Sequence, residues 1–182
     1  MNENLTKNIH RLYLAQAISL VSLCLLFFPV INLAAAIAVL VAAVIGIIGL
    51  VSLRHEHPDY MNAVYCWLGS ILIGLFQNSM TSSALPYSLV EIVSTVLSVG
   101  VIYFVIRATD SFLIPLGRED AIALGGKALR CQVIMVAVSA ATELLPLLMT
   151  GTTLICALVG FAVAIWATLA YMKYLKTAEA AI

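Results

Sequence analysis

The longest polar interval between hydrophobic runs in this chain is RATDSFLIPLGREDAIALGGKALR, residues 107–130. It contains four of the nine basic residues, Arg107, Arg118, Lys127 and Arg130. Lysine and arginine in short loops mark the cytoplasmic face of a membrane protein. We therefore predict that residues 107–130 form a cytoplasmic loop, and this loop orients the hydrophobic runs on both sides of it.

The composition indicates that lipid surrounds most of the chain. Of the 182 residues, 63% are hydrophobic and 10% are charged, and the mean hydropathy is +1.10. Soluble domains are about 45–50% apolar and about 25% charged. We predict a single all-α integral membrane domain over residues 1–182, with the lipid bilayer as its main partner. The formal net charge is zero, which argues against nucleic acid as a partner.

Six hydrophobic runs have the length of a membrane span, which needs about 20 mostly apolar residues. Residues 12–53 read almost without interruption, but a single helix of that length would be about 63 Å long. Pro29 and Asn32 supply the break, because proline cannot continue a helix without losing a backbone hydrogen bond. The predicted spans are residues 12–28, 33–53, 61–76, 88–106, 131–149 and 154–171.

With six spans paired into three hairpins, all nine lysines and arginines fall on one face, together with both termini. The loops on the opposite face, residues 29–32, 78–87 and 150–153, contain no charge. The positive-inside rule then places both termini in the cytoplasm. Six tyrosines cluster toward the basic face and are predicted to form an interfacial belt: Tyr13, Tyr60, Tyr65, Tyr103, Tyr171 and Tyr174.

The loop has its own local signals. Pro115, Leu116 and Gly117 predict a turn, and Arg118–Leu124 can form a short helix that Gly125 and Gly126 would end. The alternative is one helix that runs from Arg118 into the fifth span. Two interior glycines would cost that helix about 2 kcal/mol, so the sequence favours the break.

Small residues recur at intervals of four in two spans. The second span carries Ala34, Ala38, Ala42 and Gly46, and the sixth carries Cys156, Gly160, Ala164 and Thr168. Such stripes let helix backbones approach closely in lipid. They favour packing within the six-helix bundle, and the alternative is a surface for a homo-oligomer or a partner membrane protein.

Two of the nine acidic residues, Glu91 and Glu143, lie within hydrophobic runs. An ionisable side chain inside a span is expensive and marks a functional hypothesis. With Ser94 and Ser139 nearby, the two acids predict a site for a proton or small cation that opens to the outer face. The alternatives are that Glu91 reaches water at the headgroups and that Glu143 is protonated or hydrogen-bonded in a structural role.

Motifs for catalysis are missing from the sequence. It contains no HExxH, GxSxG, P-loop or CxxC pattern, so we expect no enzyme, no cofactor and no metal site. The segment His55–Asp59, HEHPD, has too few ligands at diagnostic spacing and is expected to be a solvated turn. The four cysteines are expected to be free, and a disulfide between Cys24 and Cys156 is the alternative.

The run SLCLLFFPVINLAAAIAVLVAAVIGIIGLVSL, residues 22–53, resembles a hairpin of small six-helix bacterial inner-membrane proteins, including the acid-resistance membrane protein family. The shared features are Phe28-Pro29 at the tip and Gly46-Ile47-Ile48-Gly49 late in the second helix. The resemblance implies a non-enzymatic protein of the bacterial cytoplasmic membrane, with an accessory or interaction role. The alternative function is a small transporter or channel that uses Glu91 and Glu143.

Overall fold

The computed structural model describes residues 3–25, 32–77, 85–148 and 151–182, and they form an all-helical fold, as predicted. The predicted break at Pro29 lies outside the described residues, but the long run on either side of it is indeed divided between two helices. The six helices are α1 (Glu3–Leu25), α2 (Asn32–Leu53), α3 (Asp59–Gln77), α4 (Leu85–Leu113), α5 (Glu119–Leu148) and α6 (Thr153–Ala181).

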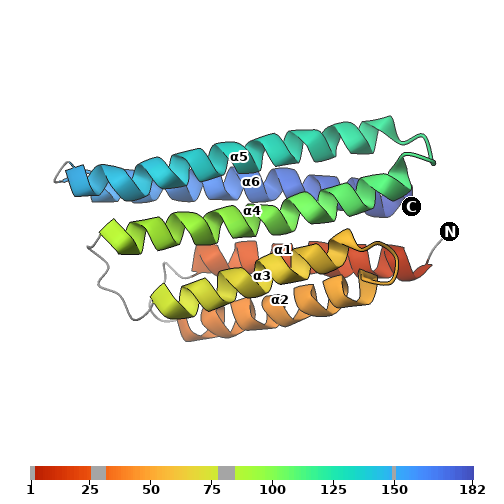
Figure 1. Ribbon diagram of the computed structural model, residues 1–182, viewed down its shortest axis with the longest axis horizontal. Coiled ribbons are helices and arrows are strands. Elements are labelled where there is room, and N and C mark those ends of the chain that lie inside the picture. The colour runs from red at the N-terminus through yellow and green to blue at the C-terminus, as the bar shows by residue number, and fades with distance from the viewer. Residues whose placement is uncertain (1–2, 26–31, 78–84, 149–150) are drawn as a thin grey trace.

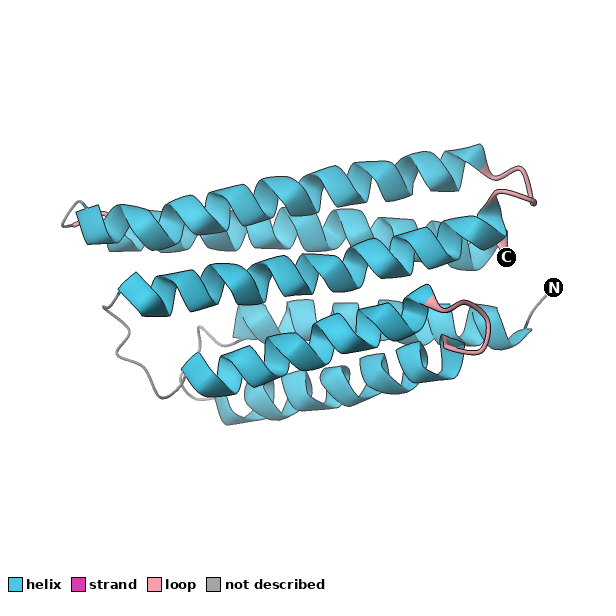
Figure 2. Cartoon of the chain, in the orientation of Figure 1, coloured by secondary structure: helices cyan, strands magenta, loops and turns pink. Residues whose placement is uncertain are grey.

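The helices lie roughly parallel to one long axis, and each packs against its neighbour in sequence (Figure 1). The closest pairs are α1 with α2, α3 with α4, and α5 with α6, which are the three predicted hairpins. Contacts of α4 with α5 and of α1 with α6 join the hairpins into a bundle. Both termini lie at one end, which we name the near end, together with the α2–α3 and α4–α5 turns (Figure 2). The opposite end is named the far end.

Four of the described helices, α2, α4, α5 and α6, are long and apolar enough to cross a membrane. Helix α1 contains Glu3, Lys7 and Arg11 in its first half, and α3 has only 19 residues. Helices α4, α5 and α6 are the longest, with 29, 30 and 29 residues, and each is therefore about 45 Å long. The hydrocarbon core of a bilayer is about 30 Å thick, so each of these helices is longer than such a core is thick.

The most deeply buried side chains gather at the near end. Leu5 and Ile9 of α1, Leu113 of α4, and Leu175 of α6 are no more than 1% exposed, and all belong to one hydrophobic cluster. Large apolar side chains elsewhere are open on the surface, among them Leu72 of α3 at 67%. The near end is therefore packed like the core of a soluble protein, while the remaining surface suits lipid.

The predicted tyrosine belt is wrong for Tyr60, Tyr171 and Tyr174, which are 0%, 2% and 0% exposed. Tyr174 donates its hydroxyl to Oδ1 of Asp110 at 2.8 Å, and Tyr60 bonds to Oγ1 of Thr109 at 2.9 Å. A buried hydroxyl that finds a partner allows the ring to pack inside the bundle. These tyrosines lock α3, α4 and α6 together at the near end.

The predicted helix break at Gly125 and Gly126 is also wrong, because α5 is continuous from Glu119 to Leu148. Gly125 is buried, and a Cβ there would lie 2.9 Å from Cε2 of Tyr174 and 3.1 Å from Cγ2 of Ile106. The glycine thus lets α5 sit close against α4 and α6, and this packing offsets the low helix propensity of glycine.

The predicted turn at 115–117 is confirmed. Gly117 has φ +66°, a conformation that glycine adopts without steric cost. The backbone N–H of Arg118 donates to the carbonyl of Leu113 at 3.2 Å, which closes the end of α4. Helix α4 therefore ends after Leu113, and its last residue is fully buried.

Candidate functional site

The far ends of α3 and α4 hold the first of the two acids predicted from the sequence. Gln77 is the last residue of α3 and is only 8% exposed. Its side-chain amide donates a hydrogen bond to Oε2 of Glu91 on α4. The carboxylate therefore points toward the α3–α4 seam, where a neutral amide holds it.

A row of hydroxyl groups continues inward from Glu91 along the same seam. Oγ of Ser70 on α3 lies 3.2 Å from Oγ of Ser94 and 3.4 Å from Oγ of Ser98, both on α4. We name Gln77, Glu91, Ser94, Ser70 and Ser98 the seam row. Seven residues separate Ser70 from Gln77, so the row extends about 10 Å along the helices.

Residue spacing explains why these side chains share one face. Glu91, Ser94 and Ser98 follow one another at intervals of three and four, the spacing of neighbours on a helix surface. Two glycines bring the helices close: a Cβ on Gly100 would lie 3.2 Å from Sγ of Cys66, and one on Gly69 would lie 3.4 Å from Cδ1 of Leu97. Hydroxyl pairs can therefore meet directly across the seam.

Glu143 on α5 faces the same region. Helix α5 packs against α4, the helix that carries Glu91. Glu143 is half-buried. Ser139, one turn away, takes part in the described hydrogen bonds only through its backbone carbonyl, which accepts from Oγ1 of Thr142 at 2.9 Å. The structure thus places Glu91 and Ser94 on the α3–α4 seam and Glu143 and Ser139 on the neighbouring helix α5.

Sequence reasoning missed Gln77 and Ser70, because both lie on a span that contains no charged residue. A signal was nevertheless present. Ser70 and Gln77 are seven residues apart on α3, and Glu91 and Ser98 are seven residues apart on α4. Polar pairs with the same spacing in two consecutive spans predict a matched polar stripe when the spans form a hairpin.

The small-residue stripe of α2 lies partly inside the bundle. Ala42 is 1% exposed, and a Cβ on Gly46 would lie 3.6 Å from Cβ of Ala15 on α1. Ala38 is half-buried, whereas Ala34 is exposed. The stripe therefore approaches α1 at its inner positions and turns toward the surface near the start of α2.

On α6, Gly160 occupies a similar position against α5. A Cβ added to Gly160 would lie 3.5 Å from Oγ1 of Thr142, and Ala164 one turn later is half-buried. Cys156 is buried one turn earlier. The cysteine side chains of the chain are all free, including Cys24 and Cys156.

The HEHPD turn between α2 and α3 carries an ion pair. Oδ2 of Asp59 lies 3.2 Å from Nε of Arg107 and 3.8 Å from Nδ1 of His57. Asn62 donates to the other oxygen of Asp59 at 3.0 Å. Within residues 3–25, 32–77, 85–148 and 151–182, no three side chains from His, Cys, Asp and Glu are grouped to hold a metal ion.

No family model matches the chain, and no curated protein or solved structure shows significant similarity to it.

Proposed function

We propose that this chain is a small transporter that binds a proton or small cation through Glu91 and Glu143. The observation that carries the proposal is the seam row, in which Glu91 is hydrogen-bonded to Gln77 and followed inward by three serines. Intramembrane carboxylates that face a bundle interior and have hydrogen-bonding neighbours are typical of proton and ion pathways.

Electrostatics explains why a positive ion would bind. Two carboxylates that repel each other are stabilised when a proton or cation is shared between them. Removal from water strengthens this effect, since Gln77 at the site is buried and supplies no charge. The amide and hydroxyl oxygens can complete the coordination of a small cation, because hard cations prefer oxygen ligands.

The serines also provide a route for a proton. Each hydroxyl both donates and accepts a hydrogen bond, so Ser94, Ser70 and Ser98 can pass a proton inward from Glu91. The row stops where Cys66 packs against Gly100. A seam closed at this point favours a transporter, which changes conformation in each cycle, over an open channel.

The proposal includes a topology of six spans with both termini in the cytoplasm of a bacterium. It is supported by the placement of both termini, the α2–α3 turn and the α4–α5 turn at the near end (Figure 1). Helices α1 and α3 would then cross together with the four apolar helices. The seam row would then open toward the outside of the cell.

The accessory or interaction role expected from the sequence has less support. It would use exposed helix faces, and α2 does expose large side chains such as Leu40 at 66% and Ile37 at 55%. Any lipid-facing helix carries such side chains, however, so they do not distinguish a partner protein from lipid. The hydrogen-bonded carboxylate of Glu91, by contrast, is a feature that contact with lipid does not require. The proposed role is non-enzymatic, because binding and moving a proton requires no nucleophile.

Proton flux into vesicles tests the proposal. The full-length protein is reconstituted into liposomes that contain a pH-sensitive dye, and an imposed pH gradient drives uptake. We expect Glu91→Gln and Glu143→Gln each to lower the protein-dependent flux at least tenfold. Glu119→Gln, which removes an exposed acid from the first turn of α5, is the matched control and keeps the flux.

Transport of a metal cation is distinguished from transport of a proton by repeating the measurement with a sodium or potassium gradient in place of the pH gradient. Equal flux for wild-type protein, both glutamine variants and empty liposomes, under every gradient, overturns the proposal. Infrared difference spectra give a second measure, since protonation of a glutamate side chain produces a carbonyl band that the corresponding glutamine variant lacks.

A further inference from the structure

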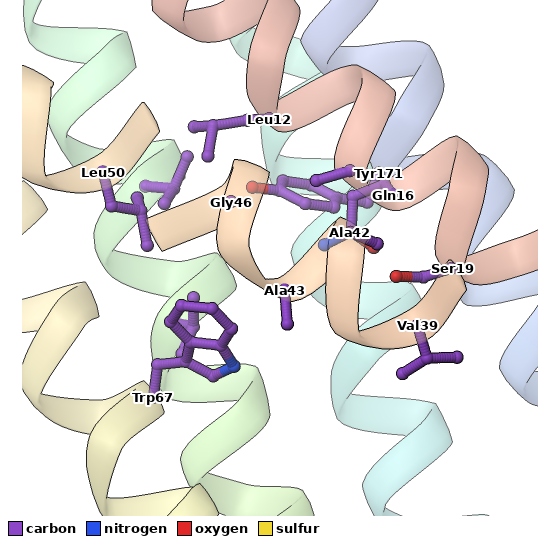
Figure 3. Close-up of a pocket in the computed structure, with 13 residues that line it drawn as sticks. Leu12, Gln16, Ser19, Val39, Ala42, Ala43, Gly46, Leu50, Trp67 and Tyr171 are labelled. Carbon is purple, nitrogen blue, oxygen red and sulfur yellow. The ribbon is translucent and has the colours of Figure 1, made fainter. Parts of the chain in front are cut away.

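A cavity of about 220 Å³ lies between α1, α2, α3, α4 and α6 (Figure 3), and its lining contains no residue of the seam row. Small residues of α2 form one wall, namely Ala42, Ala43 and Gly46, and their missing side chains leave the space open. Large apolar side chains from α1 and α2, Leu12 and Leu50, border the cavity.

Four polar side chains from three helices line this cavity: Gln16 and Ser19 of α1, Trp67 of α3 and Tyr171 of α6. Figure 3 shows Tyr171, Gln16 and Ser19 on one side of the space and the indole of Trp67 on the other. Tyr171 is only 2% exposed, so its hydroxyl is held inside the bundle.

None of these four side chains forms a hydrogen bond with another residue in the described part of the chain. The neighbouring buried tyrosines behave differently, because Tyr60 bonds to Thr109 and Tyr174 bonds to Asp110. Buried polar groups nearly always have a hydrogen-bonding partner. Among the described residues, no fully buried side-chain nitrogen or oxygen atom lacks a hydrogen-bonding partner. The hydroxyl of Tyr171 is therefore open to the cavity, where a bound molecule can supply its partner.

The lining defines what kind of molecule fits. No charged side chain borders the cavity, and a charged ligand would be costly to bury without a counter-ion. The volume is somewhat larger than that of a cavity of about 150 Å³ that takes up benzene. The rings of Trp67 and Tyr171 supply aromatic surfaces, which favour stacked or edge-to-face contact with another ring.

We propose that this cavity binds an uncharged aromatic or heteroaromatic molecule of one or two rings that carries a hydrogen-bonding group. The hydroxyl of Tyr171 and the amide of Gln16 bind the polar group on one side, the indole of Trp67 contacts the ring from the other side, and Ala42, Ala43 and Gly46 leave room for it. Val39 at the rim is 37% exposed, so the ligand enters from the bilayer. Neither Glu91 nor Glu143 lines the cavity.

Fluorescence of Trp67 tests the site directly, because the chain contains only two tryptophans. Trp166 is 47% exposed on the outside of α6, and Trp166→Phe leaves Trp67 as the single reporter. The full chain with this substitution is placed in lipid nanodiscs and titrated with para-nitrobenzyl alcohol, an uncharged one-ring quencher with a hydroxyl group. We expect saturable quenching of Trp67.

Two further substitutions in the Trp166→Phe background locate the binding. Tyr171→Phe removes only the hydroxyl and is expected to weaken binding about tenfold, which equals about 1.4 kcal/mol. Ala43→Leu fills the cavity and is expected to abolish the saturable component. Glu143→Gln alters the other site and is expected to leave quencher binding unchanged. A negative result for ligand binding is therefore distinguishable from a negative result for proton transport.

Linear quenching that is the same in all variants would show partition into lipid alone and overturn the proposal. Saturable quenching that is insensitive to both Tyr171→Phe and Ala43→Leu would place the ligand elsewhere and overturn it as well. Absence of saturable quenching, with water filling the cavity, is the third contradicting result. Helical circular dichroism and a single elution peak for each variant establish that the fold is retained.

Discussion

Gly125 of α5 lies directly against the ring of Tyr174 of α6, so that a Cβ at Gly125 would be 2.9 Å from Cε2 of the tyrosine. Ile106 of α4 closes the other side at 3.1 Å. Three helices thus meet at a position that only a residue without a side chain can occupy. This contact accounts for the continuous α5 and for the burial of Tyr174 at the near end.

The neighbouring glycine provides a matched comparison. Gly126 is exposed, and a Cβ there would meet no atom within 4 Å. Gly126→Ala is expected to stabilise the protein by about 0.5–1 kcal/mol, because alanine favours the helix. Gly125→Ala should instead destabilise it by about 1–3 kcal/mol through overpacking against Tyr174. Unfolding of the detergent-solubilised protein measures both, and stabilisation by both substitutions would refute the close contact.

This pair also shows why the sequence was misleading at the loop. Two consecutive glycines normally end a helix, and the residues flanking Gly125 and Gly126 give no indication of which helices approach from the side. The information resides in Tyr174, which is 49 residues away from Gly125. Local propensity was overruled by a tertiary contact that no nearby residue encodes.

The hydrogen bond between Tyr60 and Thr109 predicts unequal costs for its two partners. Oγ1 of Thr109 already donates to the carbonyl of Val105 at 2.8 Å, so Tyr60 is the donor between the two hydroxyls. Tyr60→Phe leaves no buried group unpaired and should cost about 1 kcal/mol. Thr109→Val strands the tyrosine hydroxyl inside the bundle and should cost about 1–3 kcal/mol.

Chemical unfolding of both variants and of the double variant completes a mutant cycle. We expect the double variant to be less destabilised than the sum of the single substitutions, since the two side chains are in contact. Equal costs for the two single variants, or strict additivity, would show that the hydrogen bond does not form.

Alkaline pH gives an independent measure of the same tyrosine. Burial raises the pKa of the Tyr60 phenol and outweighs the hydrogen bond with Thr109, which lowers it, while the nearby acids Glu56 and Asp110 raise it further. A raised pKa in the folded state means that the stabilising contribution is complete below the unfolded value of about 10 and is lost as the pH rises above it. We therefore expect the free energy of unfolding to fall with increasing pH above about pH 10.

For one such group, the free energy of unfolding falls by up to about 1.4 kcal/mol per pH unit in this range. Tyr60→Phe should weaken the dependence of the free energy of unfolding on pH. Thr109→Val retains the Tyr60 phenol and should therefore retain this pH dependence. Unfolding measured at several pH values between about 9 and 11 compares the three proteins. A Tyr60→Phe variant with the full wild-type slope contradicts the assignment to Tyr60.

The sequence was more informative about the helices than about their polar contacts. The length limit of a membrane span correctly predicted that the run 12–53 is divided between two helices. The tyrosines were misplaced for a different reason. The sequence shows that Tyr60 and Tyr174 lie near the basic residues at the ends of hydrophobic runs. Only the positions of Thr109 and Asp110 on α4 reveal that each hydroxyl has a partner inside the bundle.

The candidate site shows the same division. Glu91 was identifiable because a carboxylate in a hydrophobic run is unusual by itself. Ser70 and Gln77 became significant only when α3 was seen to lie against α4 with Ser94 facing Ser70. Unpartnered groups such as the Tyr171 hydroxyl could not be recognised from sequence, since a missing hydrogen bond is a property of the assembled bundle.

The number of crossings predicts which parts of the chain react on each side of the membrane. In a background without the native cysteines, Glu3→Cys, Arg54→Cys and Arg118→Cys report the near end, and Thr153→Cys reports the far end. With six spans and cytoplasmic termini, an impermeant maleimide should label only the Thr153→Cys variant in intact cells and the other three after lysis. Each crossing reverses the side of the next turn, so the labels test each helix separately. If α3 did not cross, Arg54→Cys and Arg118→Cys would report opposite sides, and if α1 did not cross, Glu3→Cys and Arg54→Cys would do so.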